Sequence, residues 1–454
     1  MSSFAIAGYE VRRLLRDRAV FILLMLLSGL SGYAAWNGAE WVQKRDATIG
    51  LINAENQAGL ADRRQFVVDS YPSVILPITR LVLPPGAMAP LSVGQADTYP
   101  FIADPNPAGN YTYLFRRVWA DVGSPTVRAA GRFDLAFVIV FLLPLVILAA
   151  TYDLWSRERE RGVAAMVLSQ PVGIGSLIVM KVLARGLVVV LPSTVIILAV
   201  AVWAGAREPI GIAALTLTVL AYGGFWLAVA VIISLVARRS TEAAIAAGAV
   251  WLLVVVMAPS LSLAAVDLIV PAPSDMQFST DLKARVNEIT KRQRLYREAN
   301  PTPVRTPAPR IPDSLRGYYA DLVALDGEIS PMIAAHQEAK DARRHVLDTV
   351  RFLLPSVAAQ DALDRIAGSD ADRALAFENQ ARAAQLELRL LYKSYLDRDA
   401  LITPAEYDNV QGFHFRESGG AFQWGVLADL AAVVIATILI LIAAHALRGR
   451  AALL

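Results

Sequence analysis

The chain has 454 residues, of which 56% are hydrophobic and only 18% are charged, and its net charge is +3. Soluble domains carry about 25% charged residues, so this composition predicts an integral membrane protein. The small net charge does not indicate a nucleic-acid partner, and a chain without cysteine forms neither disulfides nor thiolate metal sites.

Six apolar segments have the length of about 20 residues that a membrane-spanning helix needs. The segment 1–18 before the first of them is basic and lacks a clear signal-peptide cleavage site, so we expect it to remain as a cytoplasmic amphipathic helix. The predicted fold class is an all-α integral membrane protein. In chain order, the predicted spans are 19–36, 133–152, 178–203, 210–236, 243–270 and 424–447.

The distribution of basic residues predicts how the chain is oriented in the membrane. Arginines gather in 1–18, in 153–177, in the turn 237–242 and in the tail 448–454, all on one side of the predicted spans. The short connection 204–209 on the other side has a single arginine. By the positive-inside rule, both termini are expected to be cytoplasmic.

Two long connections, 37–132 and 271–423, are then expected outside the cytoplasmic membrane. The second is predicted to be a mainly helical domain, with the proline-rich stretch NPTPVRTPAPRIPDS as a linker between its first two helices. That domain either folds on itself as a bundle or offers a docking surface to a partner. The first is less regular, and its part LPITRLVLPPGAMAPLSVGQADTYP is expected to be loop or short strand.

Ionisable residues are scarce inside the predicted spans. Asp134 and Asp429 each lie near the outer end of a span, where an interfacial position is expected, and Arg132 is a candidate local partner for Asp134. Prolines within a span are predicted to kink it. They are Pro144, Pro192 and Pro259.

A dense charge cluster follows the second span, in YDLWSRERERGVAAMVLSQP. An ordinary positive-inside loop explains its arginines, but not its glutamates, its glycine or its L-S-Q-P ending. A short helix on the membrane surface explains all of them, because charges of both signs set a register against a partner, glycine allows a turn and proline ends the element. The candidate residues are Arg157, Glu158, Arg159, Glu160, Arg161, Gly162, Leu168, Ser169, Gln170 and Pro171.

The region GRFDLAFVIVFLLPLVILAATYDLWSRERERGVAAMVLSQPVGIGSLIVMKVLAR resembles the ABC-2 type permeases, most closely the branch with a DUF3526-type extracytoplasmic region. The shared pattern is an apolar span, an E-R-E cluster, Gly-Thr, an L-L-S-x-P ending and a lysine in the next span. Here Val163 stands where threonine is usual, and Lys181 supplies the lysine. The stretches PLSVGQADTYP, AGSDADRALAFENQ and YEVRRLLRDRAVF are also similar, so the resemblance covers most of the chain.

The resemblance implies a permease subunit in the bacterial cytoplasmic (inner) membrane, paired with a second permease that is either the same chain or a paralogue. It also implies a separate cytoplasmic ABC ATPase dimer that holds ATP and Mg, so no cofactor is expected in this chain. The segment 153–177 would then be the coupling helix region. Membrane lipids and an extracytoplasmic protein are further candidate partners. Secondary contacts with the ATPase or with lipid, or orientation signals alone, are expected at Arg12, Arg13, Arg16, Arg238 and Arg239.

Motifs for catalysis are missing from the sequence. It has no G-x-x-x-x-G-K-[ST], no H-E-x-x-H or other metal-ligand spacing and no recognisable Ser-His-Asp set, so a non-catalytic subunit without a metal site is predicted. Two functions stay open: ATP-driven export or translocation of a substrate, and mechanotransmission, in which the spans reshape an outside domain without moving a substrate. A membrane-bound enzyme is the weakest hypothesis.

Overall fold

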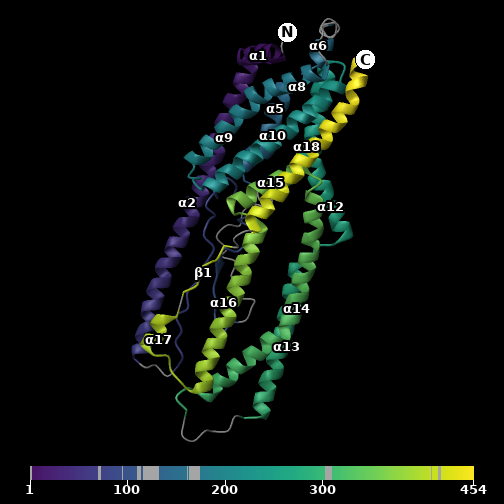
Figure 1. Ribbon diagram of the computed structural model, residues 1–454. Helices are drawn as coiled ribbons and strands as arrows, with labels where there is room; N and C mark the ends of the chain where they lie inside the picture. Colours follow the sequence, from purple (N-terminus) through teal and green to yellow (C-terminus); the bar gives the residue numbers. More distant parts are fainter. Residues whose placement is uncertain are drawn as a thin grey trace.

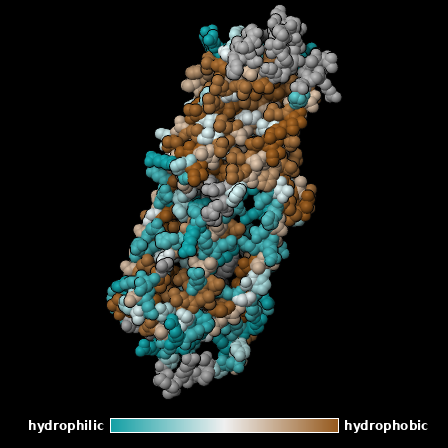
Figure 2. Space-filling view, in the orientation of Figure 1, coloured by the Kyte–Doolittle hydropathy of each residue, from teal (hydrophilic) through white to brown (hydrophobic). Residues whose placement is uncertain are grey.

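The computed structural model describes residues 3–69, 73–94, 96–109, 114–115, 132–160, 162, 174–301, 309–410, 412–417 and 421–453. The molecule is elongated and has two parts: a bundle of apolar helices at the end that carries both termini, and a distal domain at the other end (Figure 1). Figure 2 shows hydrophobic side chains covering the bundle, whereas the distal domain has a largely hydrophilic surface. The end of the bundle with α1 and the last turns of α18 is called the terminal end below.

Six helices among the described residues are long and apolar enough to cross a membrane, by length and composition. This confirms the predicted all-α membrane fold. The described residues contain one small sheet, in which β1 (Leu81–Val82) pairs antiparallel with β2 (Ile102–Ala103). The candidate spans are Arg18–Val68, Leu135–Glu160, Leu177–Trp203, Pro209–Val236, Ser240–Ile269 and Trp424–Leu447.

The bundle packs around α10. Of the 18 most apolar consecutive residues of this helix 72% are buried inside the protein, compared with 11% in the span Ser240–Ile269. Tyr222 and Trp226 of α10 are fully buried, and the Tyr222 hydroxyl donates to the Val140 carbonyl at 3.1 Å. The α-helical elements of the bundle are α1 (Ser3–Leu15), α2 (Arg18–Val68), α4 (Leu135–Phe137), α5 (Leu143–Thr151), α6 (Ser156–Glu160), α8 (Ile174–Arg185), α9 (Leu191–Trp203), α10 (Pro209–Val236), α11 (Ser240–Trp251), α12 (Ala258–Ile269) and α18 (Ala421–Leu453).

Three of the spans contain a π-helical segment just before the proline that was predicted to kink them. Proline has no N–H, and its ring collides with the carbonyl four residues earlier. The wider π turn accommodates the ring, so each span continues past its proline instead of ending there. The pairs are η2 (Val138–Leu142) with Pro144, η3 (Gly186–Val190) with Pro192, and η4 (Leu252–Met257) with Pro259.

The first span continues without interruption into the distal domain. Helix α2 is 51 residues long and ends at Val68, well beyond residue 36, where the predicted span ends. The stretch 37–68 has no proline and contains many good helix formers such as Ala, Leu, Gln, Glu and Arg, so the segment 37–132 begins as helix rather than loop. Because α2 belongs to both parts of the molecule, it provides a rigid connection between them (Figure 1).

The distal domain is built from long helices that pack against the end of α2. Its core contains Tyr319 and Tyr392, whose rings stack with centroids 4.2 Å apart. Arg389 is 1% exposed, pairs with Asp326 and donates to the Pro107 carbonyl at 3.1 Å. The helices are α13 (Asp275–Ala299), α14 (Asp313–Arg351), α15 (Pro355–Ala367), α16 (Ala371–Arg398) and α17 (Pro404–Asn409).

Helix α15 forms the junction between the distal domain and the bundle. Its residues Leu363 and Ile366 belong to the hydrophobic core of the bundle, where α15 packs on α18 and α10. Asp429 of α18 is fully buried there, with its carboxylate oxygens 3.4 Å from Arg351 and 3.4 Å from Arg365. Asp429 is therefore a buried carboxylate between two arginines, and its interfacial position stays a prediction.

Asp134 also has a structural role at the junction. Its Oδ1 accepts from the Phe137 N–H at 2.8 Å and caps α4, and its Oδ2 accepts from the Val93 N–H at 2.9 Å. The expected pair of Arg132 with Asp134 is wrong, because Arg132 lies 2.8 Å from Asp97 instead. Asp134 thus fastens the loop after β1 to the start of a span.

Candidate functional site

The charge cluster of the sequence analysis forms a short helix at the terminal end. Helix α6 follows the turn at 152–155 and lies at the same end of the molecule as α1 (Figure 1). Gly162 has a φ of +72°, in the left-handed region that glycine adopts without the steric cost of a side chain. The Gly162 N–H donates to the Arg159 carbonyl at 3.1 Å, so the chain turns directly after the helix.

Glu158 joins α6 to α8 through a largely buried ion pair with Lys181. Lys181 is 5% exposed, and its Nζ also donates to the Leu154 carbonyl at 3.3 Å and lies 5.5 Å from the centre of the Trp155 ring. A buried ammonium is costly without a counter-charge, so Glu158 stabilises this position of the lysine. The lysine that the resemblance singled out and the glutamate of the charge cluster are therefore direct partners.

A second chain of ion pairs connects the same region to the N-terminal helix. Arg157 lies 2.9 Å from Asp153, and the other carboxylate oxygen of Asp153 lies 3.0 Å from Arg185. Arg185 is 4% exposed and approaches Glu10 of α1 to 3.5 Å; Glu10 is also 4% exposed. Since Leu14 of α1 is buried in the bundle core, α1 is attached to α8 by both packing and charge.

Glu160 and Arg159 contact the turn between the fourth and fifth spans. The Glu160 carboxylate accepts from the Ser240 hydroxyl at 2.6 Å and from its N–H at 3.2 Å, at the start of α11. Arg159 donates to the Ala237 carbonyl at 3.2 Å. One turn of helix thus contacts the preceding turn, α8 and the α10–α11 connection.

The structure distributes the predicted site residues between this network and the surface. The side chains of the secondary candidates are exposed at the terminal end, and the backbone N–H groups of Arg238 and Arg239 donate to Glu242 at 3.0 and 3.4 Å. Arg161 and the ending Leu168, Ser169, Gln170 and Pro171 lie outside the described residues. The exposed secondary candidates are Arg12, Arg13, Arg16, Arg238 and Arg239.

Sequence reasoning did not identify three members of the network: Glu10, Asp153 and Arg185. Each is an ionisable residue in or beside an apolar stretch, as in SLIVMKVLARGLVVVLP around Arg185. Such residues are expected to have partners, because an unpaired charge in that environment is unfavourable. That signal marks the residues as paired, but only the fold shows which residue pairs with which.

Another group of buried ionisable residues lies at the junction near α15. Burial raises the pKa of the Asp364 carboxyl to about 7. The Ser92 hydroxyl donates to this carboxyl at 2.5 Å, and the Gln360 side-chain amide donates to it at 2.9 Å. Among the described residues, no group of three or more His, Asp or Glu side chains is arranged to hold a metal ion.

The fold defines a multi-pass membrane protein with a helical distal domain and a charge-linked helix at its terminal end. The sequence profile of the ABC-2 family transporter proteins matches residues 4–448, and the chain belongs to this family. Membership implies a permease of an ABC transporter that works with a cytoplasmic ABC ATPase. No curated protein sequence matches the chain.

Proposed function

We propose that this protein is the permease subunit that couples ATP hydrolysis by a separate cytoplasmic ABC ATPase dimer to export or translocation of a substrate across the cytoplasmic membrane. ATP and Mg would be held by the ATPase. The terminal end is taken as the cytoplasmic end, which the exposed arginines on α1 and at the α10–α11 turn support. The family assignment supports the class of transporter.

The observation that carries the coupling proposal is the set of contacts made by α6. A force applied to this helix reaches α8 through Glu158 and Lys181, and reaches α11 through Glu160 and Ser240. Glu158 and Glu160 bind groups of the same chain, so the charges of α6 attach this helix to the bundle in addition to forming a surface for a partner. They make α6 and the neighbouring spans move as one body.

Two further elements belong to the same proposal. The span Ser240–Ile269 leaves most of its apolar surface exposed, which supports contact with lipid and with a second permease, the same chain or a paralogue. The finer assignment to the DUF3526-type branch is supported by two similar stretches, 90–100 and 367–380. They meet at the junction, where the Ser92 hydroxyl binds Asp364 next to the second stretch.

The coupling proposal is tested by a triple variant of α6, Glu158→Ala, Arg159→Ala and Glu160→Ala, purified with the ATPase. We expect the complex to assemble and the stimulation of ATP hydrolysis by the permease to be lost. The matched control is the double variant Arg294→Ala and Glu298→Ala, which removes an exposed pair in α13 of the distal domain. Full stimulation by the α6 variant would contradict the proposal.

Orientation can be tested directly because the chain has no cysteine. We expect the Arg310→Cys variant to react with a membrane-impermeant maleimide from outside intact cells, and the Arg12→Cys variant to react only in inside-out vesicles. Both side chains are exposed, so accessibility depends on the side of the membrane. Labelling of the Arg310→Cys variant only from the cytoplasmic side would reverse the orientation.

A further inference from the structure

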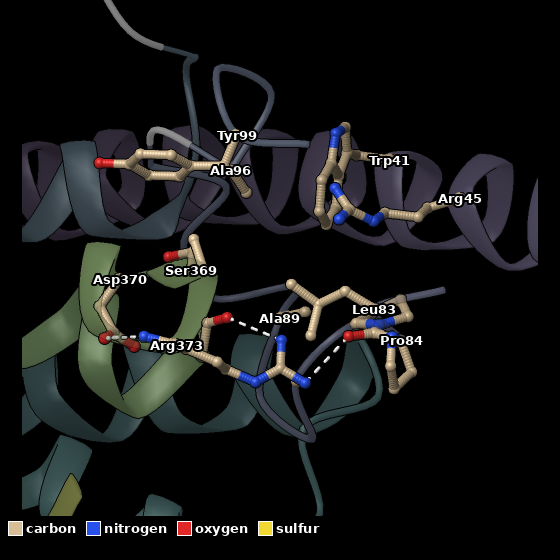
Figure 3. A pocket seen from close by; sticks show the side chains of 14 residues that line it. Trp41, Arg45, Leu83, Pro84, Ala89, Ala96, Tyr99, Ser369, Asp370 and Arg373 are labelled. Atoms are coloured by element: carbon tan, nitrogen blue, oxygen red, sulfur yellow. Dashed lines mark hydrogen bonds between the residues drawn. The ribbon is translucent and has the colours of Figure 1, made fainter. Parts of the chain in front are cut away.

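A pocket lies where α2, the loop after β1 and the start of α16 meet, between the bundle and the distal domain (Figure 3). The space of about 370 Å³ between its lining residues includes open solvent, so the pocket is an open hollow rather than an enclosed cavity. Trp41, Leu83 and Pro84 form apolar parts of its wall, and Arg45 and Arg373 line it from α2 and α16. The pocket is not part of the α6 network, and the inference below does not depend on the coupling proposal.

Arg45 is a buried cation without an ion-pair partner among the described residues. It is 9% exposed, and its guanidinium lies over the rings of Trp41, at 5.0 Å, and Phe101, at 4.1 Å. Its Nε is buried and donates to none of the described residues. Cation–π contacts supply part of the lost hydration, but they leave the buried Nε–H without an acceptor among the described residues.

Asp97 and Asp370, two carboxylates near Arg45, are engaged with other groups, and Asp46, the next residue in α2, is exposed. Asp97, whose charge acts most on Arg45, accepts from the Trp41 indole N–H at 2.7 Å and lies 2.8 Å from Arg132. Asp370 lines the pocket and caps α16 by accepting from the Arg373 N–H at 3.0 Å. Neither forms an ion pair with Arg45, so its charge has no direct counter-ion in the described part of the chain.

Arg373, in contrast, is used in building the pocket wall. Its guanidinium donates to the Gly368 carbonyl at 3.1 Å and to the Pro84 carbonyl at 3.0 Å, and it pairs with Glu417 at 2.6 Å. Figure 3 shows these two carbonyl contacts and the position of Arg45 on the opposite side of the pocket. The pocket therefore has one satisfied arginine that holds its shape and one arginine that is available to an anion.

The position of Arg45 along α2 places the pocket at the outer surface of the membrane. From Arg18, at the start of α2, to Arg45 the helix rises about 40 Å, which matches a bilayer with both headgroup layers included. Trp36 and Trp41 lie just before Arg45, as is typical of aromatic residues at the interface. Phosphate groups of lipids are found at this depth.

We propose that this pocket binds a phosphate group, with Arg45 as the charged donor and the apolar wall formed by Trp41, Leu83 and Pro84 against the adjoining part of the ligand. The phosphate can be presented by a lipid headgroup or come from solution. A guanidinium is suited to this role because it stays charged and offers several N–H donors in one plane.

The test measures thermal unfolding of the purified full chain in detergent with three added compounds. They are short-chain phosphatidylglycerol, the matching diacylglycerol without phosphate, and inorganic phosphate. We expect phosphatidylglycerol to raise the Tm in a concentration-dependent way, and diacylglycerol to have no effect. An equal rise with inorganic phosphate assigns the site to a free anion, and a rise with the lipid alone assigns it to a headgroup. No rise with either phosphate compound, or an equal rise with diacylglycerol, overturns the proposal.

Variants locate the effect. Arg45→Gln is expected to weaken phosphate-dependent stabilisation roughly tenfold to a hundredfold in apparent affinity, since it removes a charge-assisted hydrogen bond. Arg45→Lys should keep part of it. Ala96→Leu fills the pocket without changing charge and should also abolish it, which keeps the test valid if Arg45→Gln folds poorly. Arg294→Gln, on the exposed face of α13, is the control. Unchanged affinity in both Arg45→Gln and Ala96→Leu would rule the site out.

Discussion

The ion pair between Glu158 and Lys181 leads to a prediction of unequal effects from its two members. The Lys181 side chain is 7% exposed and the Glu158 side chain is 23% exposed. Glu158→Gln leaves a buried ammonium whose other neighbours among the described residues are the Leu154 carbonyl and the Trp155 ring. Lys181→Met instead leaves a carboxylate that can turn towards water.

From these exposures we expect Glu158→Gln to lower the free energy of unfolding by about 3 kcal/mol, the lower end of the range of costs for removing one partner of a buried ion pair. Lys181→Met should lower it by about 1 kcal/mol, because a partly exposed carboxylate keeps some hydration. The double variant should be more stable than Glu158→Gln alone, since it no longer contains a buried unpaired ammonium.

The assay is reversible unfolding of the purified chain in mixed micelles, followed by tryptophan fluorescence, for the wild type, both single variants and the double variant. The double-mutant cycle gives the coupling energy between the two side chains. Equal losses from the two single variants, or a double variant that shows their sum, would refute the reasoning from burial. ATPase stimulation measured on the same four proteins then relates the stability of this contact to coupling.

Three further predictions concern other parts of the chain. The folded pKa of Asp364, about 7, lies above the usual value of a carboxyl group, so the stability that this group contributes is present at low pH and is lost as pH rises to about 7. Over that range the stability of Asp364→Asn should rise relative to that of the wild type by at most roughly 4 kcal/mol. The measurement is the free energy of unfolding as a function of pH. Asp429→Asn removes the buried carboxylate that Arg351 and Arg365 share, but Arg351 keeps Asp348 and Asp361 and Arg365 keeps Asp372, so it should cost about 1 kcal/mol, seen as a lower Tm; an unchanged Tm would contradict the role given to Asp429. Gly162→Ala meets no atom of the described residues within 4 Å of the added carbon, so we expect a cost of about 1 kcal/mol from the positive φ, and Gly162→Asn, which tolerates that region better, should keep more ATPase stimulation than Gly162→Ala.

The spans were predictable because hydropathy is a local property of about 20 residues, and each span buries its apolar side chains against lipid or protein independently of its neighbours. The end of the helix that contains the first span was not predictable in the same way. Hydropathy falls after residue 36, but α2 stays helical to Val68, because loss of apolar character does not break a helix. Hydropathy locates the membrane, whereas helix ends depend on breakers and caps.

The charge cluster likewise has some features that the sequence predicts and others that depend on the fold. Its sign alternation, its glycine and the following proline mark a special connection, and the positive φ at Gly162 agrees with the predicted turn. The residues that these charged side chains contact were not predictable. Glu158 and Glu160 bind Lys181 and Ser240 inside the same chain, because α6 lies between two spans that are adjacent only after folding.

The sequence by itself determined that this protein has six spans, a basic side and a charged motif similar to that of ABC-2 permeases, because these features depend on composition over short windows. Only the tertiary structure decided the partners of the buried charges: Arg185 meets Glu10, and Asp429 meets Arg351 and Arg365. The physical reason is that a buried charge requires a counter-charge, while the residue that supplies it is brought near by packing between segments far apart in the chain. Arg45 has no such partner among the described residues, which is the observation behind the proposed phosphate site.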